Sequence, residues 1–418
     1  MSTHTIAPPL PAKGTFISSV RGSAGRLVAA QNIKIDRSTI EPFLKSISQA
    51  DYDRLSQDHG HSLPLSFSSP LEELNLLAVL ALLNFGSSFR APLHAFYKRG
   101  VFDTIRFFVL SCFLTESDHL SAQGMKRLTE NEVASLMGGL PMMVEKPHPT
   151  LPGIVVGEPG GRLREFVLMV HGVMTQTGSI LLDQGFGSLG EFIVSLLKDA
   201  KAEGLDKDEE VSDRLIGGLV ETFPAFRDMY MIDDQPVYLF KKALFLLHTI
   251  SLRFTTDPTN PFPELPKNTT TFLPTFADNV IPSLSVYLNL VELPVSSSIL
   301  GQFPKLEPAS TNPLLRPFVP APASSSDEKG RGSGPSPKGG PELSTEQATI
   351  LRSSSVHALQ ACVDLVRENG LERDEGKEYE WMRASLSDTG LDGYLWAGGK
   401  DRADWRQMER FVADSIFY

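Results

Sequence analysis

The stretch from Phe272 to Leu290 constrains this chain most, because it delivers one carboxylate to the entry of an apolar helix. Asp278 follows an aromatic-rich turn, and Pro282, four residues later, leads into an apolar run. An Asp at such a position either caps the free backbone N–H groups of the helix or turns its oxygens into a cavity. Both uses look the same in a sequence, and both stay open at this point.

Helical periodicity dominates the rest of the chain, and it predicts a mainly α protein built as a single large helical domain. The chain has 418 residues, of which 41% are hydrophobic, so it is long and apolar enough to bury a sizeable core. Few segments alternate as strands do. One small β-hairpin is expected where residues 229–232 and 236–239 flank a short polar turn.

Composition divides the chain into four parts. Residues 1–15 are expected to form a flexible N-terminus, 16–293 a helical core, and 344–418 a C-terminal helical part of the same domain. Residues 294–343 are rich in Pro, Ser and Gly. Such a segment buries too little apolar surface to order itself, so we expect a largely disordered insertion there.

The charge balance favours a small ligand. The chain carries 39 Lys and Arg against 50 Asp and Glu, a formal net charge of -11. A surface with this mean charge repels phosphate backbones, so no nucleic-acid partner is expected. No apolar run reaches the roughly 18 residues that span a bilayer, so no membrane partner is expected either. The oligomeric state is not indicated by the sequence.

The cysteine and histidine usage argues against a metal centre. Cys112 and Cys362 are too few for a multi-thiolate site or a disulfide scaffold, which favours a reducing compartment. His59 and His61 have no carboxylate or Cys at a helical interval nearby, so a polar loop explains them better than a metal. The first 35 residues carry basic side chains and no acid, as mitochondrial presequences do. We nevertheless expect a cytoplasmic protein without a metal or cofactor.

The stretch around Asp278 also resembles a family signature. Residues 276–282, Phe-Ala-Asp-Asn-Val-Ile-Pro, resemble the Phe-Ala-Asp-Tyr-Arg-aliphatic-Pro-Gln signature of the queuosine salvage proteins, which are queuosine 5'-monophosphate N-glycosylases. Other blocks of the family appear in the same order from about Ser18 to the C-terminus. The resemblance implies an arrangement similar to helix-hairpin-helix DNA glycosylases, whose chemistry pairs a Lys with an Asp.

Three blocks before Asp278 carry the resemblance. Asn84-Phe85 matches a Leu-Asn-Phe block, although the Trp that follows in the family is missing, and Phe85 is either core or a stacking wall. His61 is the nearer match to a ligand-facing His of the family. Arg227 and Asp228 end a block similar to Phe-Pro-Ser-Tyr-Arg-Asp, where adjacent charges are also typical of buried structural pairs.

Two further blocks resemble ligand-binding parts of the family. Lys241 and Lys242 match a Lys-Arg pair at the start of an apolar helix. The N-terminus of a helix is its positive end, so cations are unfavourable there unless a bound anion contacts both them and the helix. A sugar phosphate is such an anion. Residues 391–397, Leu-Asp-Gly-Tyr-Leu-Trp-Ala, resemble Leu-Asp-Tyr-Tyr-Leu-Trp-Asp, in which both acids and the first Tyr border the ligand.

The resemblance implies hydrolysis of the N-glycosidic bond of queuosine 5'-monophosphate, which releases queuine for tRNA modification. Asp278 and Lys241 are the implied catalytic residues, with Asp278 stabilising positive charge on the ribose. Asp392 is expected to bind the base or its cationic arm. The implied substrate-binding residues are Phe276, Asp392, His61, Phe85, Lys242, Arg227, Asp228, Tyr394 and Trp396.

Four positions depart from the family pattern. Asn279 replaces Tyr, Ser283 replaces Gln, Gly393 replaces Tyr and Ala397 replaces Asp. Three readings therefore stay open: an N-glycosylase with a modified pocket, a glycosylase of another nucleotide, and a binding or scaffold protein of the same fold that has lost catalysis.

Overall fold

The protein is mainly α-helical, as predicted. The computed structural model describes residues 7–56, 65–115, 118–256, 261–304, 307–316, 339–368, 370–371 and 379–418. Within these ranges, strands occur only in two antiparallel pairs. His61 lies outside the described residues, as do residues 1–6 and 317–338.

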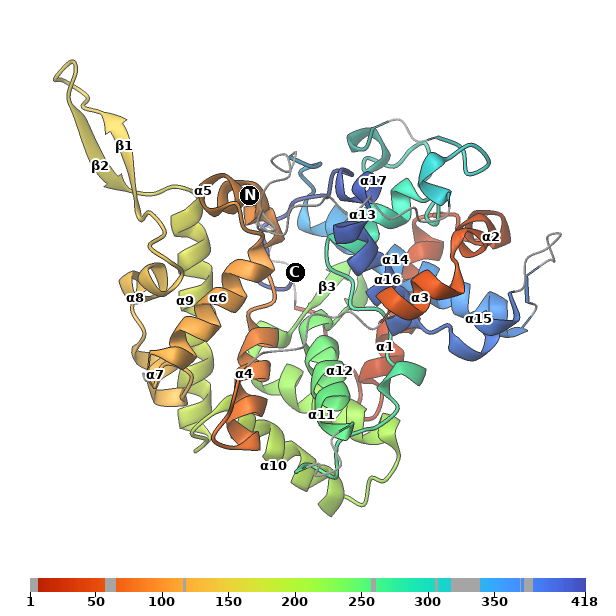
Figure 1. Cartoon of the computed structure of the whole chain (residues 1–418), viewed down its shortest axis with the longest axis horizontal. Coiled ribbons are helices and arrows are strands. Elements are labelled where there is room, and N and C mark those ends of the chain that lie inside the picture. The colour runs from red at the N-terminus through yellow and green to blue at the C-terminus, as the bar shows by residue number, and fades with distance from the viewer. Residues whose placement is uncertain are drawn as a thin grey trace, which may run out of the picture.

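Helices make up both halves of the chain (Figure 1). Before the first hairpin come α1 (Phe16–Ala30), α2 (Arg37–Ser46), α3 (Gln49–Leu55), α4 (Pro70–Leu82), α5 (Arg90–Tyr97), α6 (Val101–Leu114), α7 (Ala122–Arg127) and α8 (Glu130–Leu136). After it come α9 (Arg162–Asp183), α10 (Leu189–Ala202), α11 (Asp208–Thr222), α12 (Lys241–Thr255), α13 (Val280–Tyr287), α14 (Thr345–Glu368), α15 (Glu380–Ser385), α16 (Asp388–Asp401) and α17 (Ala403–Arg406).

The hydrophobic side chains form two buried clusters. The first draws mainly on α4, α6 and α9 to α12, and the second on α2, α3, α13, α14 and α16. Helix α1 contributes to both, since Phe16 belongs to the first cluster and Leu27 to the second. Figure 1 shows these two groups of helices side by side, with the C-terminus near the middle of the molecule.

The segment after α17 joins the two groups. The carbonyl oxygen of Tyr418 accepts from the backbone N–H of Gly86 at 3.0 Å, and that of Ile416 accepts from Lys242 Nζ at 2.7 Å. Gly86 has a φ of 96° and lies so close to Phe166 that a Cβ would come within 2.6 Å of its ring. Only glycine accommodates both demands, which fixes the turn after Phe85.

The predicted hairpin exists, and a second one was missed. β3 (Met229–Ile232) and β4 (Gln235–Tyr238) are joined by Asp233 and Asp234, both with positive φ, as a tight hairpin turn requires. β1 (Met143–Pro147) and β2 (Val155–Pro159) form an arm that projects from the molecule (Figure 1).

Two of the expected flexible parts are partly ordered. Ile299 and Phe303 from the predicted insertion are buried in the second cluster, and Asn312 donates to the carbonyl of Tyr287 at 2.7 Å. In the N-terminal part, the carbonyl of Pro9 accepts from the Tyr238 hydroxyl at 2.7 Å. The few apolar and amide side chains in these segments find partners on the helical core, which composition alone does not reveal.

Helix α9 corrects the expectation that no segment was long and apolar enough to span a membrane. Its 22 residues meet the length and hydropathy of a membrane span. A buried helix of a globular protein has the same properties, and Phe166, Val170 and Met174 of α9 pack in the first cluster.

Candidate active site

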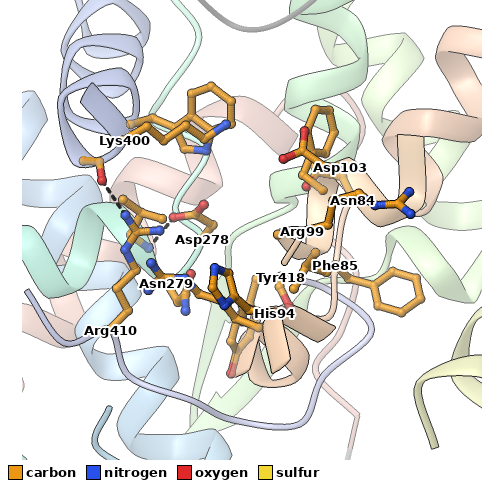
Figure 2. A pocket seen from close by; sticks show the side chains of 18 of the residues that line it. Asn84, Phe85, His94, Arg99, Asp103, Asp278, Asn279, Lys400, Arg410 and Tyr418 are labelled. Atoms are coloured by element: carbon orange, nitrogen blue, oxygen red, sulfur yellow. Dashed lines mark hydrogen bonds between the residues drawn. The ribbon is translucent and has the colours of Figure 1, made fainter. Parts of the chain in front are cut away.

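A cavity of about 720 Å³ opens between the two groups of helices (Figure 2). Its walls come from the α5–α6 region, the start of α12 and α13, the end of α16 and the segment around Arg410. A smaller pocket of about 30 Å³ adjoins it, because both are lined by Asn84, Phe102, Lys241, Asp278 and Trp396. The small pocket is completed by Phe245, Phe276 and Asp392.

Asp278 fills both roles that the sequence left open. Its Oδ1 accepts from the backbone N–H of Val280 at 2.6 Å and of Ile281 at 3.3 Å, so it caps α13. The same side chain lines the large cavity and the small pocket. Capping uses Oδ1, which leaves Oδ2 available to the cavity.

Lys241 is a buried cation in contact with the same space. Its Nζ donates to the carbonyl oxygen of Asn84 at 2.7 Å and to Asn84 Oδ1 at 3.0 Å. Burial lowers the pKa of Lys241 to about 8, against the attraction of Asp278. The preceding Phe240 has a φ of 46°, a strained conformation for a bulky residue that sets the direction in which α12 begins.

A buried ion pair positions both residues. Arg352 of α14 binds Asp228 through two hydrogen bonds of 2.9 and 2.6 Å, and neither side chain is exposed. Asp228 also accepts from the backbone N–H of Lys241 at 3.3 Å, while Arg352 donates to the carbonyl of Ala277 at 2.9 Å. The pair therefore ties the start of α12 to the residue before Asp278.

Asp392 is a buried acid beside Asp278. Burial and then repulsion by Asp278 hold the pKa of Asp392 well above its usual range. Its Oδ2 accepts from the backbone N–H of Phe276 at 2.7 Å. In its acid form this side chain is a hydrogen-bond donor to the pocket, whereas the sequence suggested a charged carboxylate.

Aromatic rings form the walls of the small pocket. Phe276 packs edge-on against Phe245, with ring centroids 6.2 Å apart, and Trp396 packs edge-on against Phe102 at 6.3 Å. The ammonium of Lys400 lies 3.2 Å from the centroid of the Trp396 ring. Such walls suit a flat heteroaromatic base.

The large cavity contains cations that the sequence analysis missed. Arg90, His94, Arg406 and Arg410 all line it. Burial and the neighbouring Arg90 and Arg406, opposed by Asp278, lower the pKa of Arg410 to about 9. Burial and nearby cations also lower the pKa of His94. Arg410 Nε and His94 Nδ1 are buried without a hydrogen-bond partner among the described residues. An anion is the missing partner for such a group.

Two departures from the family signature hold this cluster in place. Asn279 Nδ2 donates to the carbonyl of Phe411 at 2.9 Å, and Ser283 Oγ accepts from the N–H of Phe411 at 3.1 Å. Arg410, the residue before Phe411, donates to the carbonyl of Gly399 at 2.6 Å. The small polar residues at 279 and 283 thus fix the backbone that carries Arg410 next to Asp278 (Figure 2).

Several sequence-predicted site residues lie elsewhere. Lys242 donates to the carbonyls of Leu82 at 2.9 Å and Ile416 at 2.7 Å, and it does not line the cavity. Helix geometry explains this, because neighbouring residues differ in direction by about 100°. Arg227 donates to the carbonyls of Val220 and Glu221 at the end of α11, and it is also absent from the cavity.

Asp228 and Tyr394 are structural as well. Asp228 belongs to the buried pair with Arg352, so the adjacent Arg227 is not its partner. Tyr394 is buried among aromatic rings of the second cluster. Its ring centroid lies 5.9 Å from that of Trp405 and 6.2 Å from that of Tyr52. Phe85 is buried and lines the cavity, so its two expected uses coexist.

The structure thus brings Asp278, Lys241, Asp392, Phe276 and Trp396 together around one pocket. The cations on α5 and near Arg410 could have been found from the density of basic residues in 90–106 and 400–410. In the described ranges, no group of three or more His, Cys, Asp or Glu side chains is placed to hold a metal ion.

Comparison with known proteins identifies the central part of the chain. Residues 171–300 match the family model described as queuosine salvage protein. This region contains Asp228, Lys241 and Asp278, while Asp392 and Arg410 lie outside it. No curated protein matches the chain. This central part of the chain is therefore similar to the queuosine salvage proteins, and the match supports a role in queuosine salvage with a small, nucleotide-like substrate.

Proposed function

We propose that this protein hydrolyses the N-glycosidic bond of queuosine 5'-monophosphate and releases queuine and ribose 5-phosphate. The observation that carries the proposal is the convergence of Asp278, Lys241 and Asp392 on one aromatic-walled pocket. The family assignment supplies the substrate class.

The leaving group determines what the site must do. Queuine is a 7-deazaguanine, so protonation at N7, the usual way to expel a purine, is not available. More of the barrier must fall by stabilising positive charge on the ribose, and a fixed carboxylate next to the anomeric carbon does this. In the proposed reaction Asp278 stabilises that charge and orients a water molecule. The water oxygen bonds to C1' as the bond to the base nitrogen breaks. Asp278 accepts the proton that the water loses, and the departing base nitrogen takes up a proton from solvent.

The other groups of the pocket act on the base. Asp392, in its acid form, donates a hydrogen bond to the departing base and favours the negative charge that develops there. Lys241 has two of its three N–H donors on Asn84, and the third is available to the substrate. Trp396, which lines the large cavity as well as the small pocket, offers an aromatic surface to the flat ring.

The phosphate has a better site than the one expected from the sequence. Arg410 lies beside Asp278 and close to Arg90 and Arg406, and among the described residues none of the three arginines forms an ion pair. A phosphomonoester at this point neutralises their mutual repulsion and satisfies the free Nε of Arg410. We therefore assign the 5'-phosphate to this cluster in place of Lys242 and Arg227.

The direct test is a metal-free assay for release of the base from queuosine 5'-monophosphate. Asp278→Asn keeps an oxygen that caps α13 but removes the negative charge, so we expect a loss of about a hundredfold to a thousandfold in kcat. Asp36→Asn is a matched control, because Asp36 caps α2 in the same way, through Ser38 and Thr39, and does not line the cavity.

Two results would redirect the proposal. A parent protein that does not release queuine but is stabilised thermally by the nucleotide fits a binding or scaffold protein of the same fold. Release of another base in preference fits a glycosylase of another nucleotide. The absence of the family's second acid at Ala397, which lines the cavity, is the observation that keeps these alternatives in view.

A further inference from the structure

The cavity carries more positive charge than one phosphate needs. Its lining includes eight Lys and Arg side chains and three acids, in a protein whose formal net charge is -11. The cations are Arg90, Lys98, Arg99, Arg106, Lys241, Lys400, Arg406 and Arg410, and the acids are Asp103, Asp278 and Asp401. A phosphomonoester dianion offsets less than half of this excess.

Most of these cations have no acidic partner within the described part of the chain. Among the described residues, no ion pair involves Arg90, Lys98, Arg99, Arg106, Arg406 or Arg410. Elsewhere arginines are typically paired: Arg21 with Asp388 at 2.6 Å, and Arg253 with Glu73 at 2.5 Å. Like charges gathered around a half-enclosed space repel one another, and they are stabilised when an anion binds there.

The cations that line the cavity fall into two sets. Arg410 and Lys400 lie on the Asp278 side of the cavity, and Arg99 lies on the opposite side, near Asp103 (Figure 2). The second set, Lys98, Arg99 and Arg106, comes from the junction of α5 and α6. One phosphate bound next to Arg410 leaves these three cations with Asp103 as the nearby acid of the cavity lining.

Packing holds part of the second set in position without a ligand. The guanidinium of Arg99 lies 4.8 Å from the ring centroid of Tyr97 and 4.5 Å from that of Phe107, so two aromatic rings fix its position. The Tyr97 hydroxyl is buried and has no hydrogen-bond partner in the described ranges. Lys98 has a φ of 57°, a conformation that glycine or asparagine would adopt at less cost. A cation at the end of a helix is favourable in itself, so Lys98 alone would not argue for a site.

We propose that Lys98, Arg99 and Arg106 bind a second phosphate, so that the preferred ligand is a nucleotide with phosphates on both the 5' and the 3' oxygens of the ribose. The inference rests on the proposed function only in taking a nucleotide as the ligand and in placing its 5'-phosphate near Arg410. The cavity volume of about 720 Å³ lies in the upper part of the range for small-molecule sites, about 300–1,000 Å³. The site thus has room for the larger ligand.

Calorimetric titration tests the inference with three guanosine compounds, because guanine shares its ring edge with queuine. They are the 5'-monophosphate, the 5'-diphosphate and the 3',5'-bisphosphate. We expect the bisphosphate to bind at least about tenfold tighter than the other two, as one charge-assisted contact would give. The 5'-diphosphate also carries two phosphates, but both are on the 5' oxygen. Comparing it with the bisphosphate therefore separates the effect of a 3'-phosphate from the effect of total charge.

A double variant locates the effect. In Arg99→Gln/Arg106→Gln the advantage of the bisphosphate should vanish, while affinity for the 5'-monophosphate stays within about twofold. Lys13→Gln/Lys198→Gln removes two exposed charges outside the cavity and should keep the advantage. Thermal unfolding of each variant shows that it is folded.

Two outcomes overturn the inference: equal binding of the diphosphate and bisphosphate, or an advantage that survives in Arg99→Gln/Arg106→Gln. Neither depends on turnover. A protein that prefers the bisphosphate but releases no queuine refutes the proposed reaction alone. One that hydrolyses queuosine 5'-monophosphate but shows no preference refutes the second phosphate alone.

Discussion

Lys241 is a buried ammonium group with two of its donors committed to Asn84 and two acids, Asp278 and Asp392, within electrostatic reach. Burial lowers its pKa to about 8, so it changes charge within an accessible pH range. Its positive charge is attracted to Asp278, the residue on which the proposed reaction depends. Loss of the Lys241 proton therefore removes both a substrate donor and the neighbour that supports Asp278.

The pH dependence of Lys241 has opposite signs for activity and stability. We expect kcat/KM to fall as pH rises through about 8, because the folded protein then loses the proton. Between about 8 and the usual value of 10.5 the unfolded chain still holds that proton, so stability rises with pH in this window. A pH series of kcat/KM and of urea unfolding measures both.

Two variants serve as controls for this series. Lys241→Arg keeps the charge to higher pH, so the activity that remains should lose its decline near pH 8. In Lys241→Met the rise in stability between pH 8 and 10.5 should disappear. A decline in activity that is the same in Lys241→Arg and the parent would assign it to another group.

At the scale of elements, the ends of helices and the links between them build the site. The buried pair of Asp228 and Arg352 joins α14 to the start of α12 and to the residue before Asp278. Asn279 and Ser283 join α13 to the backbone next to Arg410. The site therefore depends on contacts that fix backbone positions and do not touch a ligand.

Removing one partner of the buried pair should be costly. Arg352→Met leaves Asp228 buried without a counter-charge, and we expect a loss of about 3–5 kcal/mol in the free energy of unfolding. The matched control is Arg253→Met, whose partner Glu73 is paired at the surface, with an expected cost below about 1 kcal/mol. Urea denaturation measures both. Equal costs would mean that the pair is not a structural centre of the fold.

The sequence predicts a site residue well when a local motif contains it, and poorly when its partner lies far away along the chain. Asp278, Phe276, Asp392 and Trp396 could be named because local motifs carry them. Lys242 does not line the cavity, because neighbouring helix positions face different ways. Arg352 was missed as the partner of Asp228, since the two are 124 residues apart and no local pattern connects them.

The same limit applies to the fold and its charge. Helices and the hairpin of β3 and β4 follow from local periodicity and turn residues, so they could be predicted. The packing of Ile299 and Phe303 needs the whole core, so composition gave the wrong answer there. The net charge of -11 hid a local excess of cations, because α5 and the segment near Arg410 meet only in the folded chain.

At the scale of the whole molecule, the β1–β2 hairpin is separate from the site. It projects from the body of the protein and takes no part in lining the cavity (Figure 1). Met143 is 51% exposed and Val155 58%, so little of the hairpin supports the core. An arm of this kind contributes little to the stability of the helices.

Shortening this arm should leave the protein intact. Val144 pairs with Glu158, so replacing residues 145–157 with Asn-Gly keeps the end of the ribbon and closes it with a two-residue turn. We expect Tm to change by less than about 2 °C, which is under about 1 kcal/mol for a chain of this size. Nucleotide affinity should be unchanged by calorimetry. A drop in affinity would show that the arm reaches the ligand in solution.

The position of Arg410 has a consequence for synthesis of the protein. Asp278 and Lys241 leave the ribosome well before Arg410 and the backbone that Asn279 and Ser283 clasp. In a nascent chain, α12 and α13 next to Asp278 are therefore synthesised before the segment that carries Arg410. If the 5'-phosphate binds there as proposed, its site is complete only after translation has passed Arg410.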